Sequence, residues 1–148
     1  MRKYDVLFVC IHNSARSQMA EAFLNQLGGD EFRAESAGLE PGKLNPNVVE
    51  VLKEIDINIS ANKTQSVFDL FKAGKRYDAV VTVCDGASGE RCPVFPGTMR
   101  RMNWSFSDPS SFTGTRDEVM EKTRQVRDEV RNRILQFIDE SHQFGFWI

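Results

Sequence analysis

A cysteine and an arginine six residues apart, Cys10 and Arg16, stand in the stretch CIHNSARS near the start of the chain. A thiol is a nucleophile only as its thiolate, and a guanidinium can bind two oxygens of one anion. A helix N-terminus and a nearby cation can lower a cysteine pKa from about 8.5 to about 3.5–7.5. The stretch therefore predicts an oxyanion site in which Cys10 is an ionised nucleophile, Arg16 binds the anion and Ser17 donates a hydrogen bond to the sulfur.

The residues around this pair predict a strand, a tight loop and a helix. Residues 6–10 are apolar, as in a strand buried on both faces, and apolar residues at helical spacing follow from Met19 until Gly28. Asn13 is the residue best suited to positive φ in so short a loop, and His12 is interpreted as a loop residue with a structural hydrogen bond rather than as a base. The backbone N–H groups expected to surround the anion belong to Ile11, His12, Asn13, Ser14, Ala15, Arg16 and Ser17.

Chemistry at such a site also needs an acid that protonates the departing oxygen. Asp108, in the stretch NWSFSDPSSF, is the candidate, and Pro109 stiffens the loop that carries it. An Asp-Pro pair alone is typical of a simple turn. The assignment of Asp108 as the acid therefore depends on the anion site that we expect beside it.

Two further cysteines raise the possibility of redox chemistry. Cys84 follows a second buried strand, predicted at residues 79–83, so it should reach the same sheet edge as Cys10. Adjacent parallel strands lie about 4.7–4.9 Å apart, within reach of a disulfide after modest loop movement. Cys92 can join the two if the intervening DGASGER folds back, which its small residues at positions 86–89 favour. The alternative is that Cys84 and Cys92 are small buried apolar residues.

Three thiols at one edge permit a relay. Cys10 attacks the oxyanion, Cys84 attacks Cys10 and releases the reduced product, and Cys92 attacks Cys84, leaving a disulfide for an external dithiol protein. Arsenate can accept two electrons in this way, whereas phosphate cannot. A zinc site is a weaker interpretation, because the cysteines and histidines lack a recognised ligand spacing, and no metal ligand is assigned.

Composition limits the classes of partner. The chain has 148 residues, a formal net charge of −2 and no apolar stretch near the length of about 18 residues that a membrane span needs, which argues against nucleic-acid and membrane binding. Three cysteines are an odd set and fit a secreted disulfide framework poorly, so a reducing cytoplasm is expected.

Without repeats or linkers, residues 1–148 are expected to form one domain. The apolar tail 139–148 should pack on it, or else mark a partner surface.

Strands alternate with helices along the chain, which predicts a doubly wound α/β fold with a parallel sheet of about four strands flanked by helices. Further strands are expected at 32–37 and 103–106, and helices after the pair Asn45-Pro46 and at 67–71. A capping box of Thr115 and Glu118 should begin a long final helix. Its inner face is predicted to hold Val119, Val126, Val130, Ile134, Phe137 and Ile138.

Four stretches, VCIHNSARSQMAEAFLN, SAGLEPGKLNPNVVEVLKEIDINIS, VVTVCDGASGERCPVFPG and NWSFSDPSSFTGT, resemble the thioredoxin-coupled arsenate reductases, which have a low-molecular-weight tyrosine phosphatase fold. The resemblance extends from about residue 4 to residue 138. It implies arsenate as substrate and thioredoxin, or another dithiol protein such as one of the glutaredoxin or mycothiol systems, as reductant. It implies Cys10 as nucleophile, Arg16 as oxyanion clamp, Ser17 as thiolate stabiliser, Asp108 as general acid, and Cys84 and Cys92 as second and third relay thiols.

The chain departs from the family pattern in two places, and other functions remain open. Ala15 stands where many relatives have another cysteine. In some members, residues matching Asn13, Glu21 and Ser36 bind a structural potassium ion, but SANKTQSVF offers no acid for that site; no other cofactor is expected. One alternative is a low-molecular-weight protein tyrosine phosphatase with the same nucleophile, clamp and acid, although SSF follows the Asp-Pro pair in place of a tyrosine pair. Another is a non-enzymatic redox switch.

Overall fold

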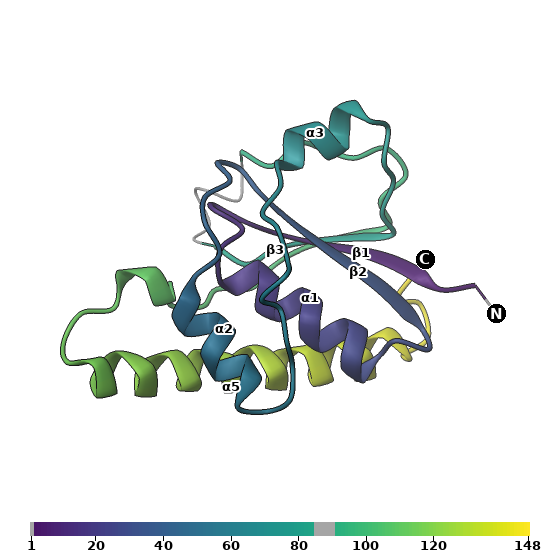
Figure 1. The fold of residues 1–148 in the computed structure, drawn as a ribbon. Coiled ribbons are helices and arrows are strands. Elements are labelled where there is room, and N and C mark those ends of the chain that lie inside the picture. The colour runs from purple at the N-terminus through teal and green to yellow at the C-terminus, as the bar shows by residue number, and fades with distance from the viewer. Residues whose placement is uncertain (1, 85–90) are drawn as a thin grey trace.

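Four parallel strands form the centre of the protein, in the order β2-β1-β3-β4 (Figure 1). The computed structural model describes residues 2–84 and 91–148, so the predicted fold-back at residues 86–89 lies outside the described part. The strands are β1 (Tyr4–Cys10), β2 (Phe32–Gly38), β3 (Ala79–Thr82) and β4 (Arg100–Asn103). The parallel α/β sheet expected from the sequence is confirmed.

Helices cover both faces of this sheet. On one face lie α1 (Arg16–Leu27), α2 (Pro46–Lys53) and α5 (Arg116–Ser141), and on the other lies the short α3 (Val67–Lys72) (Figure 1). The cap signals in the sequence are confirmed, because Asn45 caps α2 and Thr115 forms a capping box with Glu118 at the start of α5. A single 3-10 turn, η1 (Pro109–Ser111), precedes α5.

The core consists of two apolar layers, one on each face of the sheet. Phe8 and Cys10 of β1 pack in the layer formed with α1, α2 and α5, whereas Leu7 and Val9 pack in the layer formed with α3. Successive residues of a strand point to opposite faces, so a strand covered on both sides needs a continuous apolar run. This explains why β1 is the clearest strand signal in the sequence.

Two sequence predictions are corrected at the edges of this core. The last strand lies at Arg100–Asn103 rather than at 103–106, because β4 is a partly exposed edge strand whose residues RRMN lack an apolar pattern. Trp104 follows the strand directly and is buried. On α5, Met120 is buried where Val119 was expected, while Val126, Val130, Ile134 and Phe137 are buried as predicted and Ile138 is half-buried.

The apolar tail packs back on the protein. The ring of Trp147 stacks on that of Tyr4 with centroids 4.1 Å apart, and Phe146 meets Phe137 edge-on at 5.8 Å. Phe144 and Ile148 remain exposed. Across residues 2–84 and 91–148, no helix combines the length and the apolar composition needed to cross a membrane.

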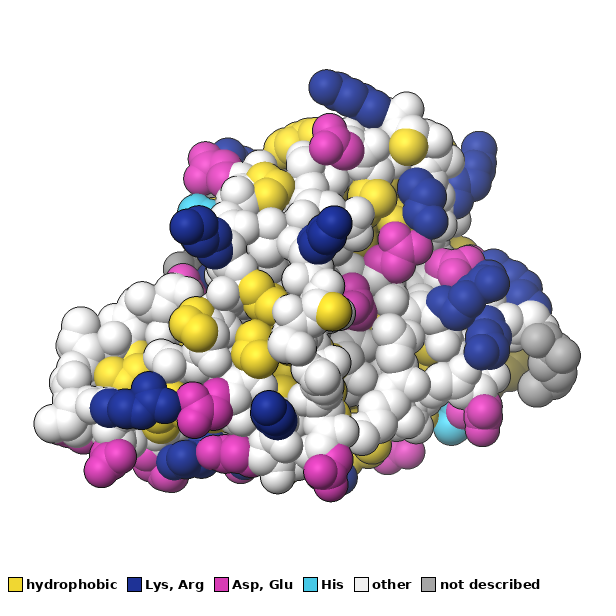
Figure 2. All heavy atoms as spheres, viewed as in Figure 1, with side chains coloured by type: hydrophobic (Ala, Val, Ile, Leu, Met, Phe, Trp, Pro, Cys, Tyr) yellow, Lys and Arg dark blue, Asp and Glu magenta, His cyan; other side chains and the backbone are white. Residues whose placement is uncertain are grey.

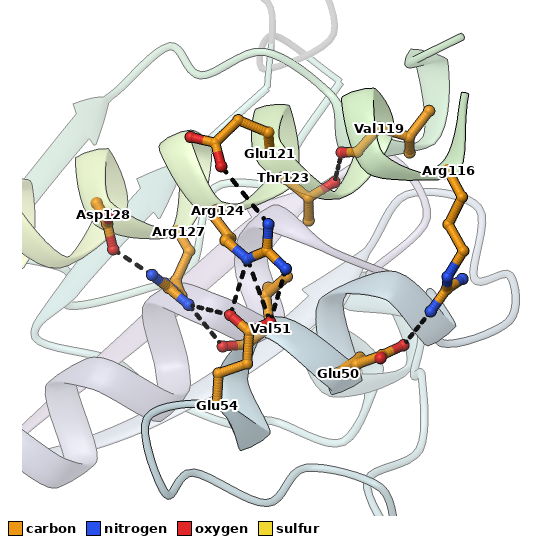
Figure 3. A network of polar contacts seen from close by, with 10 residues as sticks. All are labelled: Glu50, Val51, Glu54, Arg116, Val119, Glu121, Thr123, Arg124, Arg127 and Asp128. Atoms are coloured by element: carbon orange, nitrogen blue, oxygen red, sulfur yellow. Dashed lines mark hydrogen bonds and ion pairs between the residues drawn. The ribbon is translucent and has the colours of Figure 1, made fainter. Parts of the chain in front are cut away.

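A group of ion pairs fixes α2 against α5 (Figure 3). Both Arg124 and Arg127 bind the carboxylate of Glu54, and Arg127 also donates to the carbonyl oxygen of Val51 at 2.8 Å. The hydrogen bond from Arg124 lowers the pKa of Glu54 below its ordinary value. The pair of Glu54 with Arg124 is partly exposed and adds little to stability, whereas the Arg127 side chain is buried. Together these contacts join the end of α2 to α5. On the side of the molecule shown in Figure 2, acidic and basic side chains are interspersed.

Candidate active site

The loop between β1 and α1 turns its carbonyl groups outward. The carbonyl oxygens of Cys10, Ile11, His12 and Ser14 accept backbone N–H groups of residues 39, 40, 42 and 45 at 2.7–3.1 Å. Because C=O and N–H point in opposite directions across a trans peptide, the N–H groups of residues 11, 12, 13 and 15 face the other side of the loop. One of them, that of Asn13, lies 3.1 Å from the Cys10 sulfur. The loop thus has the form of the predicted anion site.

Two backbone features allow this tight shape. Asn13 has a φ of 55°, the positive value that its position in the sequence suggested. Gly38, at the end of β2, lies directly behind the loop, where an added Cβ would be 2.8 Å from the Ile11 carbonyl oxygen and 2.9 Å from the Asn13 nitrogen. Position 38 therefore has no room for a side chain while the loop keeps this shape.

Cys10 is surrounded by hydrogen-bond donors. Its sulfur lies 2.8 Å from the Ser17 hydroxyl oxygen, and the side chain of Asn13 donates to that same oxygen at 2.8 Å. Because Ser17 accepts from Asn13, its own proton is free to point at the sulfur. The Cys10 sulfur thus has two donors beside it, the Ser17 hydroxyl and the Asn13 N–H.

Arg16 and Asp108 meet at the open side of the loop. The Arg16 side chain is buried; its Nη1 donates to the carbonyl oxygen of Phe106 at 3.3 Å, and its Nη2 lies 3.6 Å from Asp108 Oδ2. The other carboxylate oxygen, Oδ1, accepts the N–H of Ser110 at 3.0 Å and caps η1. Asp108 is therefore a turn residue, as is typical of an Asp-Pro pair, and it is also a neighbour of the Arg16 guanidinium.

Asn45 joins the two halves of this site, a role that was not predicted from its position in the sequence. Its backbone N–H donates to the Ser14 carbonyl oxygen at 2.9 Å, and its Nδ2 lies 3.1 Å from the Ser110 hydroxyl oxygen. The residue thus connects the anion loop to the turn that carries Asp108. His12, by contrast, is exposed and bonds through Nδ1 to the Glu40 carbonyl oxygen at 2.8 Å, in agreement with a structural role.

The strand order brings Cys84 close to Cys10. The two follow adjacent strands, since Val9 pairs with Thr82 and the Val83 N–H donates to the Val9 carbonyl oxygen at 2.8 Å. Both thiols lie in the core layer on the α1 side of the sheet. None of the three cysteines forms a disulfide.

Cys92 is buried in the opposite layer, with residues such as Phe95. Burial raises the pKa of the Cys92 thiol to about 11, against the opposing effect of the Arg101 guanidinium, while a charge on Cys84 would raise it further. In this conformation the Cys92 thiol is therefore protonated at neutral pH.

This pKa predicts how Cys92 reacts with iodoacetamide in the reduced protein. Only the thiolate is alkylated, so the rate should rise roughly tenfold per pH unit until the pH approaches the pKa of about 11. Mass spectrometry of the Cys92 peptide after timed quenching measures this alkylation rate at each pH. An Arg101→Gln variant should move the profile to higher pH, whereas a plateau near the ordinary cysteine value of about 8.5 would contradict the prediction.

The side chains that match potassium ligands in some relatives are engaged in hydrogen bonds. Asn13 Oδ1 accepts the N–H of Gln65 at 3.1 Å and Nε2 of Gln18 at 3.3 Å, and Ser36 Oγ accepts Asn13 Nδ2 at 2.9 Å while bonding to Glu21 Oε1. Burial raises the pKa of Glu21 above its ordinary value. A potassium ion needs oxygen lone pairs turned toward it, but here N–H donors bond to Asn13 Oδ1 and Ser36 Oγ, and the Ser36 hydroxyl bonds to the Glu21 carboxylate. This set of side chains does not fit potassium.

Comparisons with known proteins agree with this geometry. A family model described as low molecular weight phosphotyrosine protein phosphatase matches residues 5–143. The arsenate reductase of Bacillus subtilis (strain 168) is 41% identical over 139 residues, covering 94% of this chain and 98% of the relative.

Solved structures show the same similarity. An arsenate reductase in the phosphate-binding state superposes with a TM-score of 0.76 at 28% identity, covering 93% of this chain and 98% of that one. A thioredoxin-dependent arsenate reductase of Corynebacterium glutamicum has a TM-score of 0.61 at 29% identity, covering 93% of this chain and 64% of that one. This chain belongs to the low molecular weight phosphotyrosine protein phosphatase family and, within it, to the arsenate reductases.

Proposed function

We propose that this protein reduces arsenate to arsenite at Cys10. The observation that carries the proposal is the position of Cys84, which follows the strand adjacent to that of Cys10 at the same sheet edge. An oxyanion loop with one cysteine suits transfer of a phosphoryl group. A second thiol at the same sheet edge can also form a disulfide with Cys10, which reduction of arsenate requires. The arsenate reductases among its relatives support the same substrate.

The first step is attack on arsenic. The Cys10 thiolate forms a sulfur–arsenic bond, and an As–OH group takes a proton from Asp108 and leaves as water. The inward N–H groups of the loop and the guanidinium of Arg16 bind the remaining oxygens.

The second and third steps move electrons through sulfur. A Cys84 thiolate attacks the Cys10 sulfur; the sulfur–arsenic bond breaks with its electron pair on arsenic, and arsenite leaves as the Cys10–Cys84 disulfide forms. Cys92, which must leave the opposite core layer and lose its proton before it reacts, then attacks Cys84 as a thiolate, so that Cys10 leaves as a thiolate and the disulfide passes to Cys84–Cys92. An external dithiol protein reduces that disulfide. The thioredoxin-dependent relative supports thioredoxin as this reductant, and the odd set of three cysteines, none of them in a disulfide, supports a cytoplasmic location.

The proposal is tested by arsenate-dependent oxidation of NADPH in the presence of thioredoxin and thioredoxin reductase, with a glutaredoxin system in parallel. We expect steady turnover with the thioredoxin system and release of one arsenite for each NADPH consumed. Hydrolysis of an aryl phosphate, measured beside it, should be weak. Efficient hydrolysis without arsenate reduction would instead establish the phosphatase alternative, which uses the same nucleophile, clamp and acid. Arsenite release would exclude a purely regulatory redox switch.

Replacing Asp108 by asparagine tests the role of the acid. The amide keeps the cap on η1 but has no proton to give, so formation of the Cys10 adduct should slow by about 10²–10⁴-fold. Arsenate affinity, measured by calorimetry, should change little. Single-turnover arsenite release gives the rate, and the exposed Asp139→Asn is the matched control. A large loss of affinity with an unchanged rate would show that Asp108 serves binding only.

A further inference from the structure

The orientation of the Asn13 amide is fixed from behind the anion loop. Asn13 is fully buried, and its Oδ1 accepts the backbone N–H of Gln65 at 3.1 Å. A backbone N–H can only donate, so the atom facing it must be the amide oxygen. Nδ2 is thereby directed to the hydroxyl oxygens of Ser17, at 2.8 Å, and Ser36, at 2.9 Å.

Two glutamine side chains complete this arrangement. Nε2 of Gln18, a residue only 1% exposed, lies 3.1 Å from the Asn13 carbonyl oxygen and 3.3 Å from Asn13 Oδ1. The Gln18 oxygen accepts from Asn62 at 3.0 Å, which fixes the direction of the Gln18 amide. Nε2 of Gln65 donates to the Ser36 carbonyl oxygen at 2.9 Å. The amide oxygen of Asn13 and the carbonyl oxygens of Asn13 and Ser36 therefore all accept hydrogen bonds from N–H groups.

We propose that Gln18 and Gln65 take the place of a structural cation behind the anion loop, and that they position Asn13, and through it Ser17 and the Cys10 sulfur, without potassium. A cation would hold these oxygens by charge; here polarised N–H groups hold them at fixed angles. The hydrogen bonds run without a break from Gln65 through Asn13 and Ser17 to Cys10. Gln18 and Gln65 are positioning residues, since neither contacts the sulfur.

Thermal unfolding of the reduced protein in different salts tests the absence of a cation. We expect the same melting temperature in KCl, NaCl and choline chloride at equal ionic strength. A bound ion stabilises by mass action, so a site filled at a hundredfold excess over its dissociation constant would raise the melting temperature by about 5 °C or more. A saturable rise specific to potassium would overturn the proposal.

A substitution tests the positioning role. Gln65→Glu replaces the Nε2 donor by a carboxylate oxygen, and the exposed Gln136→Glu adds the same charge elsewhere as the control. We expect Gln65→Glu alone to lower the melting temperature by about 2–4 °C and to move the pH profile of Cys10 alkylation upward. The substitution keeps the backbone N–H that bonds to Asn13 but removes the donor to the Ser36 carbonyl oxygen, so that Ser36, whose hydroxyl accepts from Asn13, is less firmly held. A Cys10 profile identical to that of the control would overturn the proposal.

Gln18→Glu should have a larger effect in the same direction, since it places a carboxylate against buried oxygens. If that variant does not fold, Gln65→Glu and the salt series still decide the question. Neither melting nor alkylation requires arsenate, so these results are independent of whether the proposed reduction occurs.

Discussion

Replacing Cys10 by serine should abolish arsenate reduction, with a fall in turnover of at least about 10⁴-fold. A serine hydroxyl is not ionised at neutral pH and cannot form the disulfide whose two sulfur atoms supply the electron pair to arsenic in the second step. The measurement is arsenite release together with NADPH oxidation in the thioredoxin-coupled assay. Aryl phosphate hydrolysis should be lost in parallel, because both reactions start from the same sulfur.

The loop itself should survive this substitution. Its inward N–H groups and Arg16 do not depend on the thiol, so arsenate or phosphate should still bind the Cys10→Ser variant with an affinity within about tenfold of the original. Calorimetric titration measures this. Residual steady turnover by Cys10→Ser would place the nucleophile elsewhere in the chain and refute the proposed mechanism.

Replacing Cys92 by serine should limit the protein to a single turnover. The first two steps need only Cys10 and Cys84, so each molecule should release one arsenite and then stop, with multiple turnover reduced by about 10²-fold or more. A burst of one equivalent, followed by mass spectrometry under non-reducing conditions, should reveal a trapped Cys10–Cys84 disulfide.

The matched control is Cys84→Ser, in which the arsenic adduct has no second thiol to release it. That variant should lack even the single equivalent of arsenite. Steady turnover of Cys92→Ser with thioredoxin alone would show that the reductant reaches Cys10 or Cys84 directly. The third thiol would then have no part in the mechanism.

The sequence predicts best those features that depend on neighbouring residues. The apolar run of β1, the Asn-Pro start of α2 and the Thr115–Glu118 capping box each satisfy their requirements within a few residues, and each is found in the structure. The same holds for Cys10 and Ser17, which lie on either side of one short loop, so their proximity follows from their spacing.

Features that depend on distant contacts were beyond such reasoning. The edge strand β4 is defined by its pairing with β3, not by an apolar pattern, and was placed three residues too late. Gln18 and Gln65 look like ordinary surface residues in the sequence, yet both donate to groups around Asn13, and Asn45 looks like a helix cap alone. Cys92 lies across the sheet from Cys84, which no spacing rule could have shown.

Asn45 links catalysis to the far surface of the molecule. It begins α2 and bonds both to the anion loop and to the turn of Asp108, while the other end of α2 is held to α5 by the pairs of Glu54 with Arg124 and Arg127 (Figure 3). The position of Asp108 relative to Cys10 thus depends in part on ion pairs at the opposite end of α2. If the proposed roles of these two residues are correct, we expect substitutions at Glu54 or Arg124 to change the rate of the first chemical step while every residue around the anion loop stays the same.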